Sequence, residues 1–221
     1  MALAPNALTT VARLQAAGAA GDSARLEQLI NAVSNRVEEH LGRALGYQVR
    51  TLEPYQGSGV QRLYLQHWPI LEVTEVRLNE VEVTDWRLLI NGARHGWLYR
   101  SRGWPIAAPR DWTGDPDLDA ELYPFEVSYR AGYVLPQFAT SEDEDLNPPD
   151  GIALPRDIEE AVIQACLVQE SRPAAVGAGL MSERTPGGWE QQWSAGEASR
   201  RAVLPQQTLE LLASYERITL L

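Results

Sequence analysis

The chain has 221 residues, 44% of them apolar, and a formal net charge of −11. Wrapping of nucleic acid requires clustered basic residues, so this acidic balance argues against that mode of binding. All 19 basic residues are arginine, which excludes chemistries that need a lysine, such as a P-loop or a Schiff base. One cysteine excludes an internal disulfide framework, and no apolar run approaches the roughly 20 residues of a membrane span.

Two helices are predicted at the start of the chain. The segment 7–17 is a short helix capped by Thr9 or Thr10, with Val11 and Leu14 facing inward. The segment 22–43 is a long amphipathic helix that Asp22 or Ser23 can begin and Gly42 or Gly46 can end. Its apolar residues follow the helical period along one face: Leu26, Leu29, Ile30, Val33, Val37 and Leu41. This stripe needs a partner elsewhere in the chain.

After Gly46 the apolar residues alternate, which is typical of strands. Strands are predicted at 47–53, 60–65, 73–83, 85–90, 97–101 and 125–130. The turn Gly57-Ser58-Gly59 indicates a hairpin between the first two of these strands. The pair 85–90 and 97–101 is expected to form around the loop 91–96. The last strand points Phe125, Val127 and Tyr129 inward.

Helical periodicity returns at Pro155. A second apolar stripe contains Ile158, Ala161, Val162, Ala165, Cys166 and Val168 and ends near Pro173. Residues 173–203 have no period and are expected to form a long arm. A final helix over 205–220 places Leu209, Leu212 and Tyr215 on one face. Helices followed by a small antiparallel sheet and by more helices predict an α+β fold.

The predicted domain organisation follows from this order. Residues 1–46 and 152–221 form a helical core with a C-terminal arm, because the stripes of 22–43 and 155–172 lack other partners of equal length. Residues 47–135 form an inserted β domain, and residues 136–151 form an acidic loop that contains Glu142, Asp143, Glu144 and Asp145.

Metal and nucleophile sites are poorly supported by the sequence. Asp115, Asp117, Asp119 and Glu126 have part of the spacing of a calcium loop, but Ala120 stands where the sharp turn requires glycine. A solvated acidic loop is therefore favoured. His40, His67 and His95 lie far apart and form no ligand cluster. Cys166 lies within a helical stripe, where a buried apolar role is favoured. We expect no metal or cofactor, and an assembled hydrolytic site remains the alternative.

The seven tryptophans suggest two kinds of surface. Those beside strand ends could stack on sugars, although sheet core or an interface is favoured for them: Trp68, Trp86, Trp97, Trp104 and Trp112. Trp189 and Trp193 lie in the arm, without a local core to enter. We expect these two to contact a partner surface, together with Leu209, Leu212 and Tyr215.

Several segments in a fixed order resemble one protein family. The order is "VEEHLGRAL", "VRTLEPYQG", "LYLQHWPILEVTEVRLN", "GWLYRSRGWP", "FEVSYRAGYVLP", "LPRDIEEAVIQACLVQESR" and "LPQQTLELLASYERI". This order is similar to that of the head–tail connector (adaptor) proteins of tailed phages and phage-derived particles, in the larger form with an inserted sheet. The resemblance covers about residues 8–217. The acidic insert 140–150 and the arm 173–203 depart from the family pattern.

The resemblance implies a structural role in the virion without catalysis. Proteins of this family form a ring, typically twelvefold, beneath the portal protein and around the channel through which DNA leaves. The expected partners are the portal, neighbouring copies and the next neck or tail-completion protein, with no membrane and no specific DNA binding. Assembly would take place in the host cytoplasm. An acidic lining from Glu142–Asp145 would favour sliding of DNA. The alternative function is a small hydrolase or carbohydrate-binding module that uses the tryptophan-rich sheet.

Overall fold

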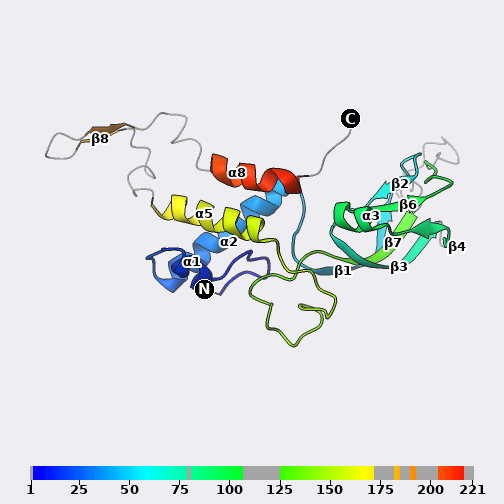
Figure 1. Cartoon of the computed structure of the whole chain (residues 1–221), viewed down its shortest axis with the longest axis horizontal. Coiled ribbons are helices and arrows are strands. Elements are labelled where there is room, and N and C mark those ends of the chain that lie inside the picture. Colours follow the sequence, from blue (N-terminus) through cyan, green and yellow to red (C-terminus); the bar gives the residue numbers. More distant parts are fainter. Residues whose placement is uncertain are drawn as a thin grey trace, which may run out of the picture. The chain divides into compact units, whose positions relative to one another are not determined.

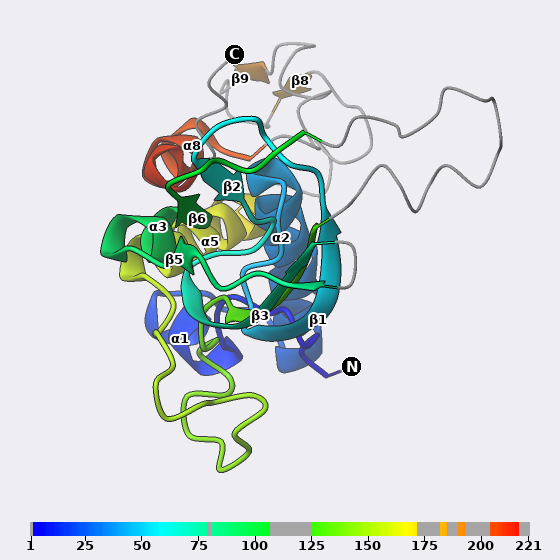
Figure 2. The same ribbon diagram turned by 90° about the vertical axis from the view of Figure 1, so that its right-hand side faces the viewer.

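The computed structural model describes residues 2–78, 81–106, 125–171, 182–184, 190–192 and 204–216. The chain divides into two compact units, Met1–Gly42 with Leu154–Leu221 and Arg43–Ala153. We call them the helical unit and the β unit (Figures 1 and 2). The predicted α+β class is confirmed. Within the described residues, each helix is too short or too polar to span a bilayer.

The helical unit is built from both ends of the chain. It contains α1 (Val11–Ala16), α2 (Ser23–Leu41), α5 (Arg156–Glu170), α8 (Gln206–Leu212) and the 3-10 turn η3 (Ala213–Tyr215). Helix α5 packs against α2 and α8, and α1 packs against α2. The predicted packing of the two long amphipathic helices is therefore confirmed.

Local capping explains where α2 begins and ends. The Asp22 side chain accepts a hydrogen bond from the Arg25 N–H at 2.7 Å, which satisfies one free donor of the first turn. Gly42 ends the helix with a φ of 65°, a left-handed conformation that glycine adopts without steric cost. Of the predicted stripe, all residues but Leu29 are buried. Leu29 is half-buried because it lies at the flank of the stripe, and Ser34 occupies the buried face instead.

The other helices begin near their predicted positions, but the final one is shorter than the predicted 205–220, since α8 ends at Leu212 and the 3-10 turn after it ends at Tyr215. Helix α1 starts at Val11 with Thr10 as its cap, later than predicted, and the preceding Leu8 is buried in a non-helical segment. In α5 the predicted residues Ile158, Ala161, Val162, Ala165 and Cys166 are buried. Val168 is half-buried, near the end of the helix at Glu170.

The β unit contains two sheets. The four-stranded sheet has the order β1 (Gln48–Tyr55), β7 (Phe125–Ala131), β3 (Ile70–Leu78) and β4 (Val81–Glu82). The three-stranded sheet has the order β2 (Arg62–Tyr64), β6 (Trp97–Arg100) and β5 (Trp86–Arg87). All neighbouring pairs in both sheets are antiparallel.

The predicted hairpin across Gly57–Gly59 is wrong. Strand β1 pairs with β7, and β2 pairs with β6 in the other sheet. Alternation of apolar residues specifies the buried face of a strand but not its partner, and β7 offers the more buried neighbour. The predicted pairing of 85–90 with 97–101 is confirmed, although the intervening loop is largely the short helix α3 (Ile90–His95).

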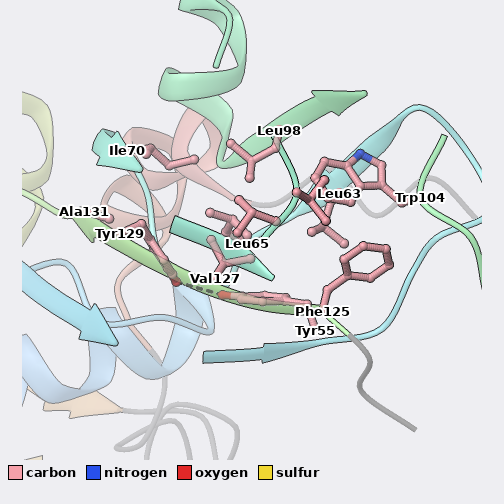
Figure 3. Packing of buried hydrophobic residues seen from close by; sticks show 12 residues of the cluster. Tyr55, Leu63, Leu65, Ile70, Leu98, Trp104, Phe125, Val127, Tyr129 and Ala131 are labelled. Carbon is pink, nitrogen blue, oxygen red and sulfur yellow. Dashed lines mark hydrogen bonds between the residues drawn. The ribbon is translucent and has the colours of Figure 1, made fainter. Parts of the chain in front are cut away.

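The core of the β unit lies between the two sheets, as Figure 3 shows. Trp104 and Phe125 meet edge to face, with ring centroids 5.2 Å apart. Val127 and Tyr129 are buried on the central strand β7, as predicted. Leu63 and Leu98 are directly opposite each other in β2 and β6 and contribute the apolar face of the smaller sheet.

In the predicted arm, the backbone of β8 (Ser182–Arg184) pairs with that of β9 (Glu190–Gln192). Trp189 and Trp193 lie outside the described residues.

Candidate functional site

A cluster of ionisable side chains lies where β1 meets β7. The hydroxyl groups of Tyr55 and Tyr129 both donate to Glu53 Oε2, and the two hydroxyl oxygens are 2.8 Å apart (Figure 3). The backbone N–H of Gln66 donates to the Tyr55 hydroxyl at 3.0 Å. His67 Nε2 lies 3.8 Å from Glu53 Oε1. The cluster thus joins two neighbouring strands and the loop after β2.

The chemistry of this cluster is that of a structural network. Burial, reinforced by the hydrogen bond to Glu53, raises the pKa of both Tyr55 and Tyr129, so neither phenol ionises near neutral pH. Burial and the nearby Arg50 charge lower the pKa of His67, which favours the neutral ring. One oxygen of the Glu53 carboxylate already accepts two hydroxyl groups. Since buried polar groups must find partners, the cluster stabilises the junction of β1 and β7.

A carbohydrate-binding module would need exposed tryptophan rings on which sugars can stack, and the described tryptophans of the β unit do not form such a surface. Trp68, Trp97 and Trp104 are each at most 8% exposed, and Trp86 packs against the core. The Arg43 guanidinium lies 3.8 Å from the centroid of the Trp68 ring, and that of Arg62 lies 4.8 Å from the Trp97 ring. Trp112 lies outside the described residues. These rings contribute their area to packing.

The residues considered for a metal site are not brought together where the structure describes them. Glu126 lies in β7 opposite Pro54 and Arg77, and Asp115, Asp117 and Asp119 fall outside the described residues. His40 Nε2 lies 2.9 Å from Glu216 Oε1 in the helical unit. Among the described residues, no group of three or more histidine, cysteine or acidic side chains is placed to hold a metal ion.

The three residues of the last helix that were predicted to contact a partner differ in how far they are buried. Leu212 is completely buried inside the helical unit, so its expected exposure for a partner is wrong. The neighbouring Thr208 explains this position, because its hydroxyl donates to the Ala161 carbonyl of α5 at 3.3 Å and fixes α8 on that helix. Leu209 and Tyr215 are half-buried, and the Tyr215 hydroxyl lies 3.4 Å from Asp157 Oδ2. A partner could reach only these two.

The acidic loop 136–151 is exposed at its acidic run. Glu142, Asp143, Glu144 and Asp145 all face solvent. The loop is braced at its base, where Asn147 Nδ2 donates to the Ser141 carbonyl at 3.0 Å and Arg130 pairs with Asp150 at 3.0 Å. Four carboxylates therefore extend from a fixed base on the β unit.

No protein-family profile matches the sequence, and no curated protein matches it significantly. Three solved structures similar to the chain are chains of gene transfer agent (GTA) particles. A chain from the neck of an empty GTA particle, computed with C6 symmetry, is 19% identical with a TM-score of 0.47, over 100% of this chain and 95% of that chain. A chain from the neck of a native particle, computed with C12 symmetry, is 18% identical with a TM-score of 0.47, over 100% of this chain and 94% of that one. A chain of the native virion is 18% identical with a TM-score of 0.45, over 100% and 95% of the two chains.

Proposed function

We propose that this chain is a structural protein of the head–tail neck of a phage-like particle, an adaptor that forms a ring beneath the portal around the DNA exit channel. The proposal rests on the sequence resemblance described above, because structural likenesses with TM-scores of 0.45–0.47 do not establish a family. The observation that carries it furthest is the division into units. A helical unit built from 1–42 and 154–221, interrupted by a β unit over 43–153, is the organisation that the larger adaptor form implies.

The geometry of the ionisable groups is compatible with a structural role. The Glu53, Tyr55 and Tyr129 cluster is occupied by its own hydrogen bonds. The exposed acidic run Glu142–Asp145 and the exposed arginines of the sheet suit the polar rim of a contact between proteins. The ring would present one surface to the portal and another to the next neck or tail-completion protein.

The proposed portal contact is the C-terminal region, with Trp189 and Trp193 as anchors and Leu209 and Tyr215 beside them. Buried aromatic anchors often dominate protein interfaces. The double change Trp189→Ala and Trp193→Ala should therefore weaken attachment far more than it lowers the free energy of unfolding. The double change to phenylalanine is the matched control, because it keeps an aromatic ring at each position.

Electron microscopy of the full chain mixed with portal rings from the same genome tests the function directly. We expect a ring of this protein against the portal, and cleavage within 173–203 by limited proteolysis in free protein but not in the assembly. Particles made without the protein should be DNA-filled heads that lack tails. Normal tailed particles in its absence would refute the neck function.

A further inference from the structure

A row of two arginines and a tyrosine crosses the smaller sheet of the β unit. Arg62 of β2 and Arg87 of β5 are both directly opposite Tyr99 of the middle strand β6. Residues directly opposite on antiparallel strands share a face of the sheet, and strands lie about 4.8 Å apart, so the row spans about 10 Å. Arg62 and Arg87 are exposed, whereas Tyr99 is half-buried. Two exposed arginines thus flank one tyrosine across the three strands, and the Arg62 guanidinium lies over the Trp97 ring.

Other exposed side chains lie on the same face or close to it in the sequence. Tyr64, opposite Trp97 on the same face, is 37% exposed. Leu89 and Ile90, which follow Arg87 closely in the chain, are 42% and 80% exposed. We call Arg62, Tyr64, Arg87 and Tyr99 the arginine face. Arginine and tyrosine are among the residues that are enriched in protein interfaces and among their energetic hot spots.

In the described part of the chain, neither Arg62 nor Arg87 forms an ion pair, and the Arg62 guanidinium instead lies over the Trp97 ring, 4.8 Å from its centroid. The ion pairs found there involve other arginines, at positions 13, 77, 100 and 130. The sequence over 84–106 contains four arginines and one aspartate, in a chain whose net charge is −11. The arginine face therefore places two exposed arginines together on an acidic protein, and the described residues provide no ion pair to either arginine.

The acidic loop has the complementary chemistry. Residues 136–151 contain five acidic residues and no basic residue. Leu146, directly after the acidic run, is 37% exposed, and Ile152 is 43% exposed. Both surfaces thus combine charge with exposed aliphatic groups. Both belong to the compact unit Arg43–Ala153, and both views show the loop well away from β2, β5 and β6 (Figures 1 and 2).

We propose that the acidic loop of one copy of this chain docks on the arginine face of a second copy. Since the two surfaces differ, the contact is head-to-tail, and repetition of such a contact closes a ring when the rotation permits. This inference rests on the proposed ring function and names the surfaces that would join its neighbours. It assigns Glu142–Asp145 to a contact between copies, in place of the channel lining expected from the sequence.

Charge reversal with complementation is the test, measured by sedimentation of the full chain at low ionic strength. One variant carries Arg62→Glu and Arg87→Glu, and the other carries Glu142→Arg and Glu144→Arg. Each variant alone should associate on the order of 100-fold more weakly than the wild type, because like charges then face each other. An equimolar mixture should recover association, since each variant supplies the surface that the other has lost. Added salt should weaken association of the wild type.

The matched control carries Arg25→Glu and Arg156→Glu, the same charge change at exposed arginines of the helical unit. It should associate like the wild type. All variants should remain folded, and the loss of the Arg62 contact with Trp97 should lower the melting temperature of the first variant only slightly. The docking would be overturned if the wild type stayed monomeric at the highest attainable concentration, or if the mixture failed to recover association. It would also be overturned if the wild type bound a fluorescent DNA duplex and the variant with Arg62→Glu and Arg87→Glu did not. Complementation in a protein that never joins portal rings would instead refute the neck function alone.

Discussion

Glu159 offers a sharp test of how the helical unit is held together. This carboxylate of α5 is 9% exposed and accepts a hydrogen bond from the Thr9 hydroxyl at 3.0 Å. Its other oxygen pairs with Arg13 at 2.5 Å. Thr9 is completely buried, whereas the Arg13 side chain is 51% exposed and can be rehydrated. When the carboxylate is removed, most of the loss in the free energy of unfolding therefore comes from the Thr9 hydroxyl, which is left buried without its acceptor.

Glu159→Ala should lower the free energy of unfolding by about 2–3 kcal/mol, since a buried hydroxyl loses a charged acceptor and the exposed ion pair adds under about 1 kcal/mol. Glu159→Gln should cost only about 1 kcal/mol, because its amide oxygen can still accept from Thr9. Denaturant unfolding followed by far-UV circular dichroism reports this loss, since most of the described helix lies in the helical unit. Equal midpoints for Glu159→Ala and the wild type would refute the reasoning.

Three further predictions concern buried groups. Ile30→Ala should lower the free energy of unfolding by about 2–4 kcal/mol and Leu29→Ala by clearly less, because Ile30 is fully buried and Leu29 is not. Equal denaturant midpoints for the two variants would contradict this prediction. Burial, Arg50 and Arg43 lower the pKa of His67 against the opposing effect of Glu53. As pH falls, the imidazole ring of the unfolded chain therefore binds a proton before that of the folded protein. The contribution of His67 to stability is complete above about pH 6.5 and is lost as pH drops below it. Unfolding followed by tryptophan fluorescence should show that the free energy of unfolding falls less steeply with decreasing pH in His67→Gln than in the wild type. Burial raises the pKa of the Cys166 thiol to about 12, so a thiol reagent should react with it only as fast as the helical unit unfolds around it. Rapid labelling of the native protein would contradict this prediction.

Helix α2 could be predicted from the sequence because its signals are local. The apolar stripe, the Asp22 cap and the terminal Gly42 all lie within one short segment, and each acts on its own helix. The polar partners of the core could not be predicted. Thr9 and Glu159 are 150 residues apart, and no local pattern indicates that their side chains meet. Ser34 is similar, since its hydroxyl accepts from the Leu8 backbone N–H at 3.1 Å.

The strand pairing required information that alternation does not contain. Residues 47–53 lie largely within β1 as predicted, yet β1 pairs with β7, which follows it by some 70 residues of chain. A short glycine turn suggested a nearer partner. The same limit applies to the arginine face. Arg62, Arg87 and Tyr99 come from three strands, and only the register of β2, β6 and β5 places them in one row.

The net charge describes this protein poorly because the two signs are separated on its surface. A value of −11 argues against uniform phosphate binding, but it conceals the arginines of 84–106 and the acids of 136–151. If copies join through these two surfaces, the arginine face is neutralised inside the assembly. Residues outside this contact then carry the acidic excess of the proposed ring. If that proposed ring surrounds a DNA channel, its acidic excess would repel phosphate at short range and favour sliding of DNA over binding.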